Sequence, residues 1–139
     1  MITEPVAPVN DMLAFYERFY TAIAGSRAYG EFCRRVFGRD FGQHGFADMA
    51  QLQALIEALA VQPDDDVLDL GCGNGGMAGY IAETTGAYVT GIDISPSAIG
   101  QAQRLAAVRP DRLSFRAADI ASPPFAPASF DALVAIDTL

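Results

Sequence analysis

The stretch VLDLGCGNGG, residues 67–76, constrains the possible folds of this chain more than any other part of its sequence. An apolar run is followed there at once by glycines at positions 71, 73, 75 and 76. Glycine permits the tight turn between a strand and a helix, and it lets the backbone approach a ligand closely. The spacing Gly71-x-Gly73-x-x-Gly76 fits the dinucleotide fingerprint, so the stretch predicts a cradle for a nucleotide-type ligand.

Strand and helix patterns alternate along the chain around this loop. Apolar runs typical of strands lie in DDDVLDLG (64–71), AYVTGID (87–93), RLSFRAAD (112–119) and FDALVAI (130–136). One helical segment ends at Gly86, and another begins after Ser95, which is a suitable N-cap ahead of Pro96. The alternation predicts an α/β fold, in which a parallel sheet has helices on both of its faces.

The N-terminal part of the chain has a helical pattern. Apolar residues at a 3.6-residue period predict three helices, from Asn10 to Gly25, up to Gly38, and over about 47–60. The periodic positions of the first helix are Met12, Phe15, Tyr16, Phe19, Tyr20 and Ile23. We therefore divide the chain into a flexible start (1–9), a helical region (10–62) and an α/β core (63–139).

Composition limits the chemistry and the partners. The 139 residues suffice for one domain with a hydrophobic core, and their net charge is −8. An acidic surface repels phosphate backbones, so DNA and RNA are disfavoured as partners. Every basic residue is an arginine, which excludes a lysine nucleophile or Schiff base.

Metal and targeting signals are weak in this sequence. Two cysteines and a single histidine are too few for a zinc site, so we expect no metal. The start, MITEPVAPVN, lacks the positive charge and apolar run of a signal peptide, and no apolar stretch reaches the length of a membrane span. We therefore expect a cytoplasmic protein with reduced thiols and no membrane partner.

Acidic residues occur where the predicted strands end, and ligands of open parallel sheets bind beyond those ends. Asp69 stands at the end of the first strand, where a dinucleotide fold keeps an apolar residue, and its carboxylate suits a positively charged ligand. Asp93 lies at the offset of a ribose-binding acid. Asp119 is placed to accept a hydrogen bond from an exocyclic amine, such as that of adenine.

Together, VLDLGCGNGG, GIDIS (91–95) and AADI (117–120) resemble the successive motifs of class I S-adenosylmethionine-dependent methyltransferases, in order and in separation. The helical lead-in and FGQHGF (41–46) are similar to small-molecule methyltransferases whose N-terminal helices form a lid. The resemblance implies a Rossmann-like three-layer sandwich with the strand order 3-2-1-4. It also implies S-adenosylmethionine as the cofactor, a lid over 10–62 and a small-molecule methyl acceptor.

The resemblance assigns roles to the residues of the glycine loop. Gly71 and Gly73 would let the backbone pass close to the methionine and ribose parts of the cofactor. Cys72 would be a small filler of the turn, and the helix after Gly75 would direct its free N–H groups toward the ligand. Asp69 would orient the loop and the methionine ammonium.

Four residues after the second and third strands would hold the nucleoside. Asp93 would accept hydrogen bonds from both ribose hydroxyls, and Ile94 would pack on the adenine ring. Asp119 and Ile120 would hold the edge of the adenine. An alternative for Asp119 is that it only caps the loop that follows.

Methyl transfer from a sulfonium needs alignment and exclusion of water more than it needs reactive side chains. If the acceptor must lose a proton, then His44, Tyr20 or Asp137 could serve as the base. For His44 the alternative is an ordinary loop histidine. For the aromatic stripe that contains Tyr20, the alternatives are core packing and a cation–aromatic contact with the sulfonium.

The sequence stops at Leu139, directly after the fourth predicted strand, whereas the sheet of the family has seven strands. In the order 3-2-1-4 the apolar segment ALVAI (132–136) would be an exposed edge, which favours pairing with another strand. We therefore expect part of a longer polypeptide, or self-association through this strand. The donor-binding half is present without the acceptor half, so we expect donor binding with little or no turnover by this chain alone.

Two other functions remain open at this level. The glycine spacing also fits an NAD-dependent oxidoreductase, which would bind NAD but not S-adenosylhomocysteine. A non-catalytic binding or scaffold module is the other alternative, and association of the purified chain through its fourth strand would favour it.

Overall fold

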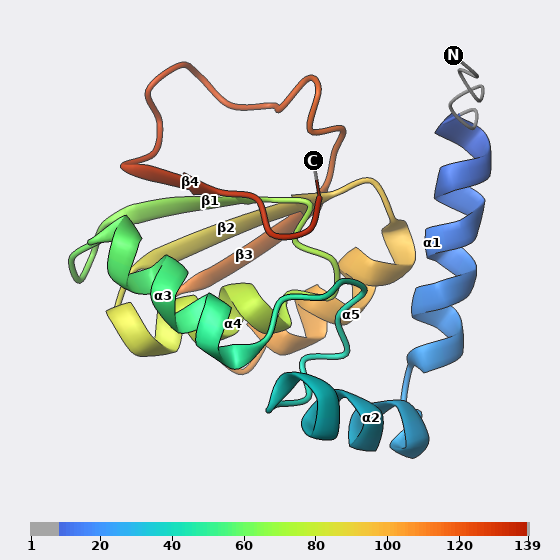
Figure 1. Ribbon diagram of the computed structural model, residues 1–139. Coiled ribbons are helices and arrows are strands. Elements are labelled where there is room, and N and C mark those ends of the chain that lie inside the picture. Colours follow the sequence, from blue (N-terminus) through green and yellow to red (C-terminus); the bar gives the residue numbers. More distant parts are fainter. Residues whose placement is uncertain (1–8, 139) are drawn as a thin grey trace, which may run out of the picture.

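The computed structural model describes residues 9–138 of the chain. Within them, parallel strands form one sheet in the order β3-β2-β1-β4 (Figure 1). The strands are β1 (Asp66–Leu70), β2 (Tyr88–Asp93), β3 (Leu113–Ala117) and β4 (Ala132–Val134). The predicted α/β fold and strand order are confirmed.

The register of the sheet places the ends of three strands at one edge. Leu70 of β1 pairs with Ile92 of β2, and Ile92 pairs with Arg116 of β3. The residues that follow these strands therefore emerge side by side. This common edge is where the glycine loop, Asp93 and Asp119 meet.

Figure 1 shows α3 (Met49–Leu59), α4 (Gly76–Thr85) and α5 (Pro96–Ala106) on one face of the sheet. The prediction of helices on both faces is therefore wrong for the described residues. The crossovers through α4 and α5 step in the same direction along the sheet, and right-handed crossovers then put both helices on the same face. The direction reverses only between β3 and β4, where the segment 118–131 contains three prolines and no helix.

The core lies between the sheet and these helices. Val67 and Val89 on the sheet, Ile81 on α4 and Leu52 on α3 are all at most 1% exposed. Burial of each such side chain contributes roughly 1.5–3 kcal/mol to stability. Helix α3 begins at a capping box in which the Asp48 carboxylate accepts from the Gln51 backbone N–H, 2.9 Å away.

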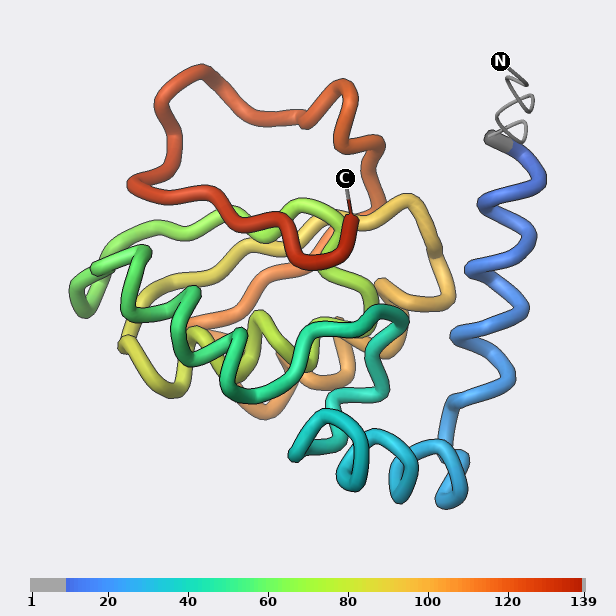
Figure 2. Tube along the Cα trace, in the orientation of Figure 1, coloured from blue at the N-terminus to red at the C-terminus, as the bar shows by residue number. Residues whose placement is uncertain are grey.

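The N-terminal helices α1 (Val9–Ile23) and α2 (Arg27–Phe37) form where the apolar periodicity predicts them. Helix α1 packs against α5, and the chain then returns through α2 and the loop 38–48 to the carboxyl edge of the sheet (Figure 2). Gly38, at φ 89°, ends α2 in the left-handed conformation that glycine favours. The N-terminal region therefore covers the edge where the candidate site lies.

The predicted flexible start, residues 1–9, lies outside the described residues except for Val9, which begins α1. None of the helices found in residues 9–138 is long and apolar enough to cross a membrane.

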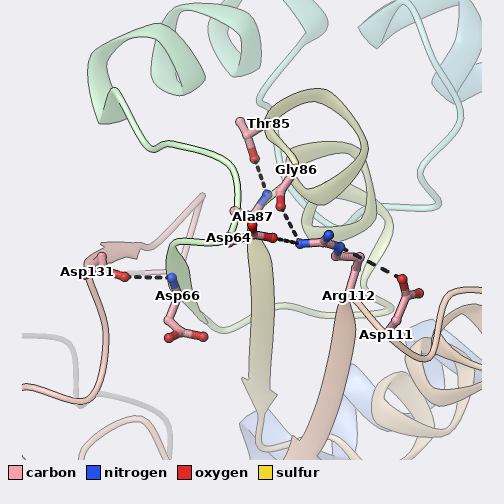
Figure 3. Close-up of polar contacts among 8 residues, drawn as sticks. All are labelled: Asp64, Asp66, Thr85, Gly86, Ala87, Asp111, Arg112 and Asp131. Atoms are coloured by element: carbon pink, nitrogen blue, oxygen red, sulfur yellow. Dashed lines mark hydrogen bonds and ion pairs between the residues drawn. The ribbon is translucent and has the colours of Figure 1, made fainter.

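A polar cluster holds the opposite, amino-terminal edge of the sheet (Figure 3). Arg112 donates hydrogen bonds to the Asp64 carboxylate at 2.6 Å and to the Gly86 carbonyl at 2.8 Å. The Asp66 N–H donates to the Asp131 carboxylate at 2.8 Å. All of these residues precede or begin their strands, so the cluster joins strand starts and lies away from the candidate site.

Candidate functional site

A cavity of about 330 Å³ opens at the carboxyl edge of the sheet. Its sheet side consists of Asp93 at the end of β2, Ile94 directly after it, and Asp119 and Ile120 after β3. Its other wall comes from helix α1, and Gly71, His44 and Asp137 also line it. The cavity thus brings together most of the residues that the sequence predicts for the site.

Asp93 connects the glycine loop to helix α5. One carboxylate oxygen accepts from the Gly73 N–H at 2.9 Å, and the other accepts from the Ser95 N–H at 2.9 Å. Each carboxylate oxygen can accept two hydrogen bonds, so acceptor capacity remains toward the cavity. This arrangement fits an acid that binds vicinal hydroxyls.

The glycine loop is held against β2 by its backbone. The N–H groups of Gly71 and Cys72 both donate to the Ile92 carbonyl, at 2.8 and 3.0 Å. Gly71 and Gly73 have positive φ values of 73° and 55°, which L side chains rarely adopt. A Cβ at Gly73 would collide with the Tyr20 hydroxyl, so the packing of α1 over the loop also requires this glycine.

Gly75 differs from the other predicted cofactor contacts. It lines neither the large cavity nor the smaller one described below. A Cβ at this position would meet the Phe115 ring at 2.7 Å and the Ala102 methyl at 3.0 Å. Close packing of the loop on β3 and α5 therefore accounts for Gly75, and its predicted contact with the cofactor has no support in this geometry.

A smaller cavity of about 30 Å³ lies behind the large one and is lined by Asp69, Cys72, Gly73 and Gln43, among others. Asp69 is only 2% exposed. Burial, together with the charge of Asp93, raises the pKa of the Asp69 carboxyl to about 7. No hydrogen bond to this carboxylate is found within residues 9–138, so a cationic group of a ligand fits beside it.

Cys72 is buried in the turn, as its predicted role as a filler requires. Burial, and then the charges of Asp69 and Asp93, raise the pKa of its thiol far above the ordinary value. A Cβ at Gly91 would meet the Cys72 Sγ at 2.7 Å, so the thiol fills the space above β2. A thiol that stays protonated is a poor nucleophile.

Asp119 makes a hydrogen bond within the loop that follows β3, and it also lines the large cavity. One carboxylate oxygen accepts from the Ala121 N–H at 2.9 Å, which caps the following loop. The residue also lines the large cavity, and its second oxygen has no hydrogen bond within the described residues. That oxygen is available to a ligand amine.

Tyr20 and His44 line both cavities. The His44 ring makes edge contacts with three rings of α1, at centroid distances of 5.6 Å to Phe15, 5.1 Å to Tyr16 and 4.8 Å to Phe19. Tyr20 is 5% exposed, and burial followed by the charge of Asp93 raises the pKa of its hydroxyl. A raised pKa keeps the Tyr20 hydroxyl protonated, which disfavours this residue as a base.

Asp137 has a clear anchoring function. It adopts a positive φ of 54°, and its Oδ2 accepts from the N–H groups of Phe46 at 2.9 Å and Ala47 at 2.8 Å. These bonds tie the loop 38–48 to the residues after β4. The geometry therefore supports a positioning role for Asp137 more directly than the predicted role as a base.

Several residues of the site were not identified from the sequence. They are Met12, Leu13, Ala121, Ile136 and Thr138 in the large cavity, and Gln43, Asn74 and Met77 in the smaller one. Tyr16, which also lines the large cavity, belongs to the aromatic stripe for which the sequence left core packing and a cation–aromatic contact as alternatives. The apolar periodicity of residues 10–23 could have indicated the α1 wall, since it marks one face of a helix. Nothing in the local pattern indicated Gln43, because Asp69, Asn74 and Met77, which line the cavity with it, are distant in the chain.

Residues 67–139 match the family described as "Methyltransferase domain". A sterol 24-C-methyltransferase of Gibberella zeae is 37% identical over 108 residues, which cover 76% of this chain and 28% of that protein. A phosphoethanolamine N-methyltransferase of Triticum aestivum is 30% identical over 130 residues, covering 94% of this chain and 25% of that protein.

A solved structure shows the same fold. The methyltransferase from Geobacter sulfurreducens in complex with S-adenosyl-L-homocysteine has a TM-score of 0.61 and 27% identity, covering 85% of this chain and 42% of that one. The family match over residues 67–139 includes the glycine loop, and it favours the methyltransferase interpretation of that loop over the dinucleotide-binding one. The chain spans about a quarter of the two curated relatives, and it belongs to the class I S-adenosylmethionine-dependent methyltransferases, with S-adenosylmethionine as its cofactor.

Proposed function

We propose that this chain binds S-adenosylmethionine in the two cavities and forms the donor-binding part of a methyltransferase that acts on a small molecule. The observation that carries the proposal is the joint position of two acids at the carboxyl edge of the sheet. Asp93 faces the large cavity, and the buried, unpaired Asp69 lines the small one. Asp93 therefore provides a hydrogen-bond acceptor for hydroxyl groups, and Asp69 provides a negative charge for a cationic group.

The large cavity fits the nucleoside end of the cofactor. Asp93 retains acceptor capacity for the ribose hydroxyls, and Ile94 and Ile120 provide apolar surface for a flat ring. The free carboxylate oxygen of Asp119 can accept a hydrogen bond from the adenine amine. These are the roles that the sequence motifs predict for the same residues.

The small cavity fits the charged end. An ammonium beside Asp69 would supply the positive charge that burial of this carboxylate requires. The glycine loop supports this placement, because Gly71 and Gly73 line the cavity without side chains. Cys72 lines it as a neutral thiol.

Methyl transfer requires an aligned acceptor in a site that excludes water, and the cofactor supplies an already activated methyl group. Helix α1 and the loop 38–48 would provide this enclosure as a lid. His44, packed among Phe15, Tyr16 and Phe19, lies at the junction of the two cavities. We assign His44 to the methyl-acceptor side of the site, where it is the candidate base.

The acceptor is proposed to be a small molecule. The apolar wall that Met12, Leu13 and Tyr16 form suits a compact organic acceptor. The net charge of −8 disfavours a polyanionic acceptor such as nucleic acid. The names of two relatives, a sterol and a phosphoethanolamine methyltransferase, describe small-molecule acceptors.

Isothermal titration with S-adenosylhomocysteine tests the proposal. We expect saturable binding to the wild-type chain, and a loss of at least about tenfold in affinity for Asp93→Ala, because hydrogen bonds to a charged group are lost. Asp111→Ala is the matched control, since Asp111 is exposed and lies at the opposite edge of the sheet. Absence of heat with S-adenosylhomocysteine, combined with binding of NAD, would contradict the proposed function.

A further inference from the structure

Gln43 carries a buried hydrogen-bond acceptor without a partner. The residue is 7% exposed, and its Oε1 is buried and has no hydrogen-bond partner in the described part of the chain. Buried polar groups in folded proteins are almost always satisfied, and an exception needs an explanation. Gln43 lines the small cavity together with Asp69.

The orientation of the Gln43 amide follows from its surroundings. The side-chain Nε2 lies 3.4 Å from the Ala47 carbonyl oxygen, which can only accept a hydrogen bond. A flipped amide would place two acceptors against each other. The carbonyl end is therefore the unpartnered end. The backbone is also held in place, because the Tyr29 hydroxyl donates to the Gln43 carbonyl at 2.7 Å.

The small cavity is rich in acceptors. Asp69 on β1 and Gln43 in the loop 38–48 both line it, and the side chain of each ends in an acceptor oxygen. Among the described residues, neither group receives a hydrogen bond. A cavity of about 30 Å³ has room for one small polar group. A primary ammonium is such a group, and its three N–H bonds suit two or more acceptors.

The two cavities share a boundary, because Tyr20, His44, Gly71, Ile136 and Asp137 line both. A ligand in the large cavity can therefore extend one group into the small cavity. The geometry points to Gln43 as a specificity residue that accepts a hydrogen bond from the α-ammonium of the methyl donor, opposite Asp69. This inference rests on the proposed function and adds a residue that recognises the amino group of the donor by a hydrogen bond.

The assignment predicts selectivity between two ligands that differ only in the ammonium. S-adenosylhomocysteine carries it, whereas 5′-S-(3-carboxypropyl)thioadenosine keeps the nucleoside, the sulfur and the carboxylate without it. We expect Gln43→Met, which keeps the length of the side chain and removes the acceptor, to raise the Kd for S-adenosylhomocysteine about tenfold. The Kd for the desamino analogue should stay within twofold of wild type.

Gln53→Met is the matched control, because Gln53 is an exposed glutamine on α3. It should leave both dissociation constants unchanged. Binding of the desamino analogue by Gln43→Met shows that the variant is folded, and its Tm should not fall, since the substitution removes an unsatisfied buried acceptor.

The outcomes separate the two proposals. If Gln43→Met has the wild-type Kd for S-adenosylhomocysteine, or if its Kd rises equally for both ligands, then Gln43 does not bind the ammonium. If the wild-type chain binds neither ligand, the proposed function itself fails. A loss of affinity that is confined to S-adenosylhomocysteine supports both the proposed function and the role of Gln43.

Discussion

At the scale of single residues, the site combines groups that stabilise the fold with one that opposes it. Asp93 is tied to two backbone N–H groups, and Asp137 likewise holds two. Asp69 is as buried as the core and has no hydrogen bond in residues 9–138. A charge in such a place destabilises the folded state until a ligand compensates it.

Asp69→Asn is expected to stabilise the free protein in a pH-dependent way. The folded pKa is about 7 and the unfolded pKa about 3.8, so the folded state retains the proton between these values. Wild-type stability therefore falls, relative to the variant, as pH rises from about 4 to 7, and the difference is constant above that range. Urea unfolding should show a difference on the order of 2 kcal/mol at pH 8 and almost none at pH 4.

The same substitution should weaken donor binding. An ammonium favours the ionised Asp69, so wild-type affinity for S-adenosylhomocysteine should rise from pH 6 to pH 8, and Asp69→Asn should abolish this slope. Glu57→Gln, at an exposed position of α3, provides the control for both measurements. A wild-type affinity that does not change over this pH range would contradict the placement of a cation beside Asp69.

At the scale of elements, Glu17 of helix α1 binds the start of α5, and Gln101 of α5 donates to the Tyr20 carbonyl of α1 at 2.7 Å. Glu17 accepts hydrogen bonds from the Ser95 hydroxyl, the Ser97 hydroxyl and the Ser97 N–H, the last at 3.0 Å, at the start of α5. Burial alone would raise the Glu17 pKa, but these hydrogen bonds lower it below the ordinary value. The carboxylate thus caps α5 from a neighbouring helix and places the α1 wall over the cavity.

Glu17→Ala is expected to loosen α1 without unfolding the core. Amide hydrogen exchange over residues 12–23 should become faster, because the contact with the N-terminus of α5 is lost, while β1 and β2 stay protected. Dissociation of S-adenosylhomocysteine should become faster as well if α1 acts as a lid. Glu31→Ala on α2 is the control, since Glu31 is exposed and pairs with Arg35 on its own helix. Unchanged exchange in α1 would show that other contacts hold the helix.

At the scale of the whole molecule, one side of the sheet is poorly covered in the described residues. Within residues 9–138, strand β4 pairs with β1 alone, and Leu133 on β4 is 58% exposed. An apolar edge strand of this kind is a site for pairing with another chain. Self-association through β4 therefore stays a prediction that the 139-residue chain can test directly.

Light scattering after size-exclusion chromatography should show a mass that rises with protein concentration. Leu133→Lys should shift the chain toward the monomer, because a charge at an edge opposes strand pairing. Val108→Lys tests for a general effect of charge, as Val108 is 76% exposed and lies outside the sheet. A monomer at every concentration would rule out association through β4.

Short-range sequence patterns determined the secondary structure and the positions of the acids at the strand ends. The helices, the strands and the positions of Asp69, Asp93 and Asp119 follow from periodicity, capping and glycine, because those signals act over a few residues. The strand order came from the family resemblance rather than from the pattern itself. The sequence therefore sufficed for the fold class and for the positions of the three acids of the candidate site.

Only the tertiary structure decided which distant residues meet. Asp137 accepts from the N–H of Phe46 across 91 positions of sequence, and Gln43 lines the same cavity as Asp69 from a loop without regular structure. The single helical layer likewise depends on the direction of the crossovers. These features result from packing between elements, and packing depends on three-dimensional contacts that no short-range pattern encodes.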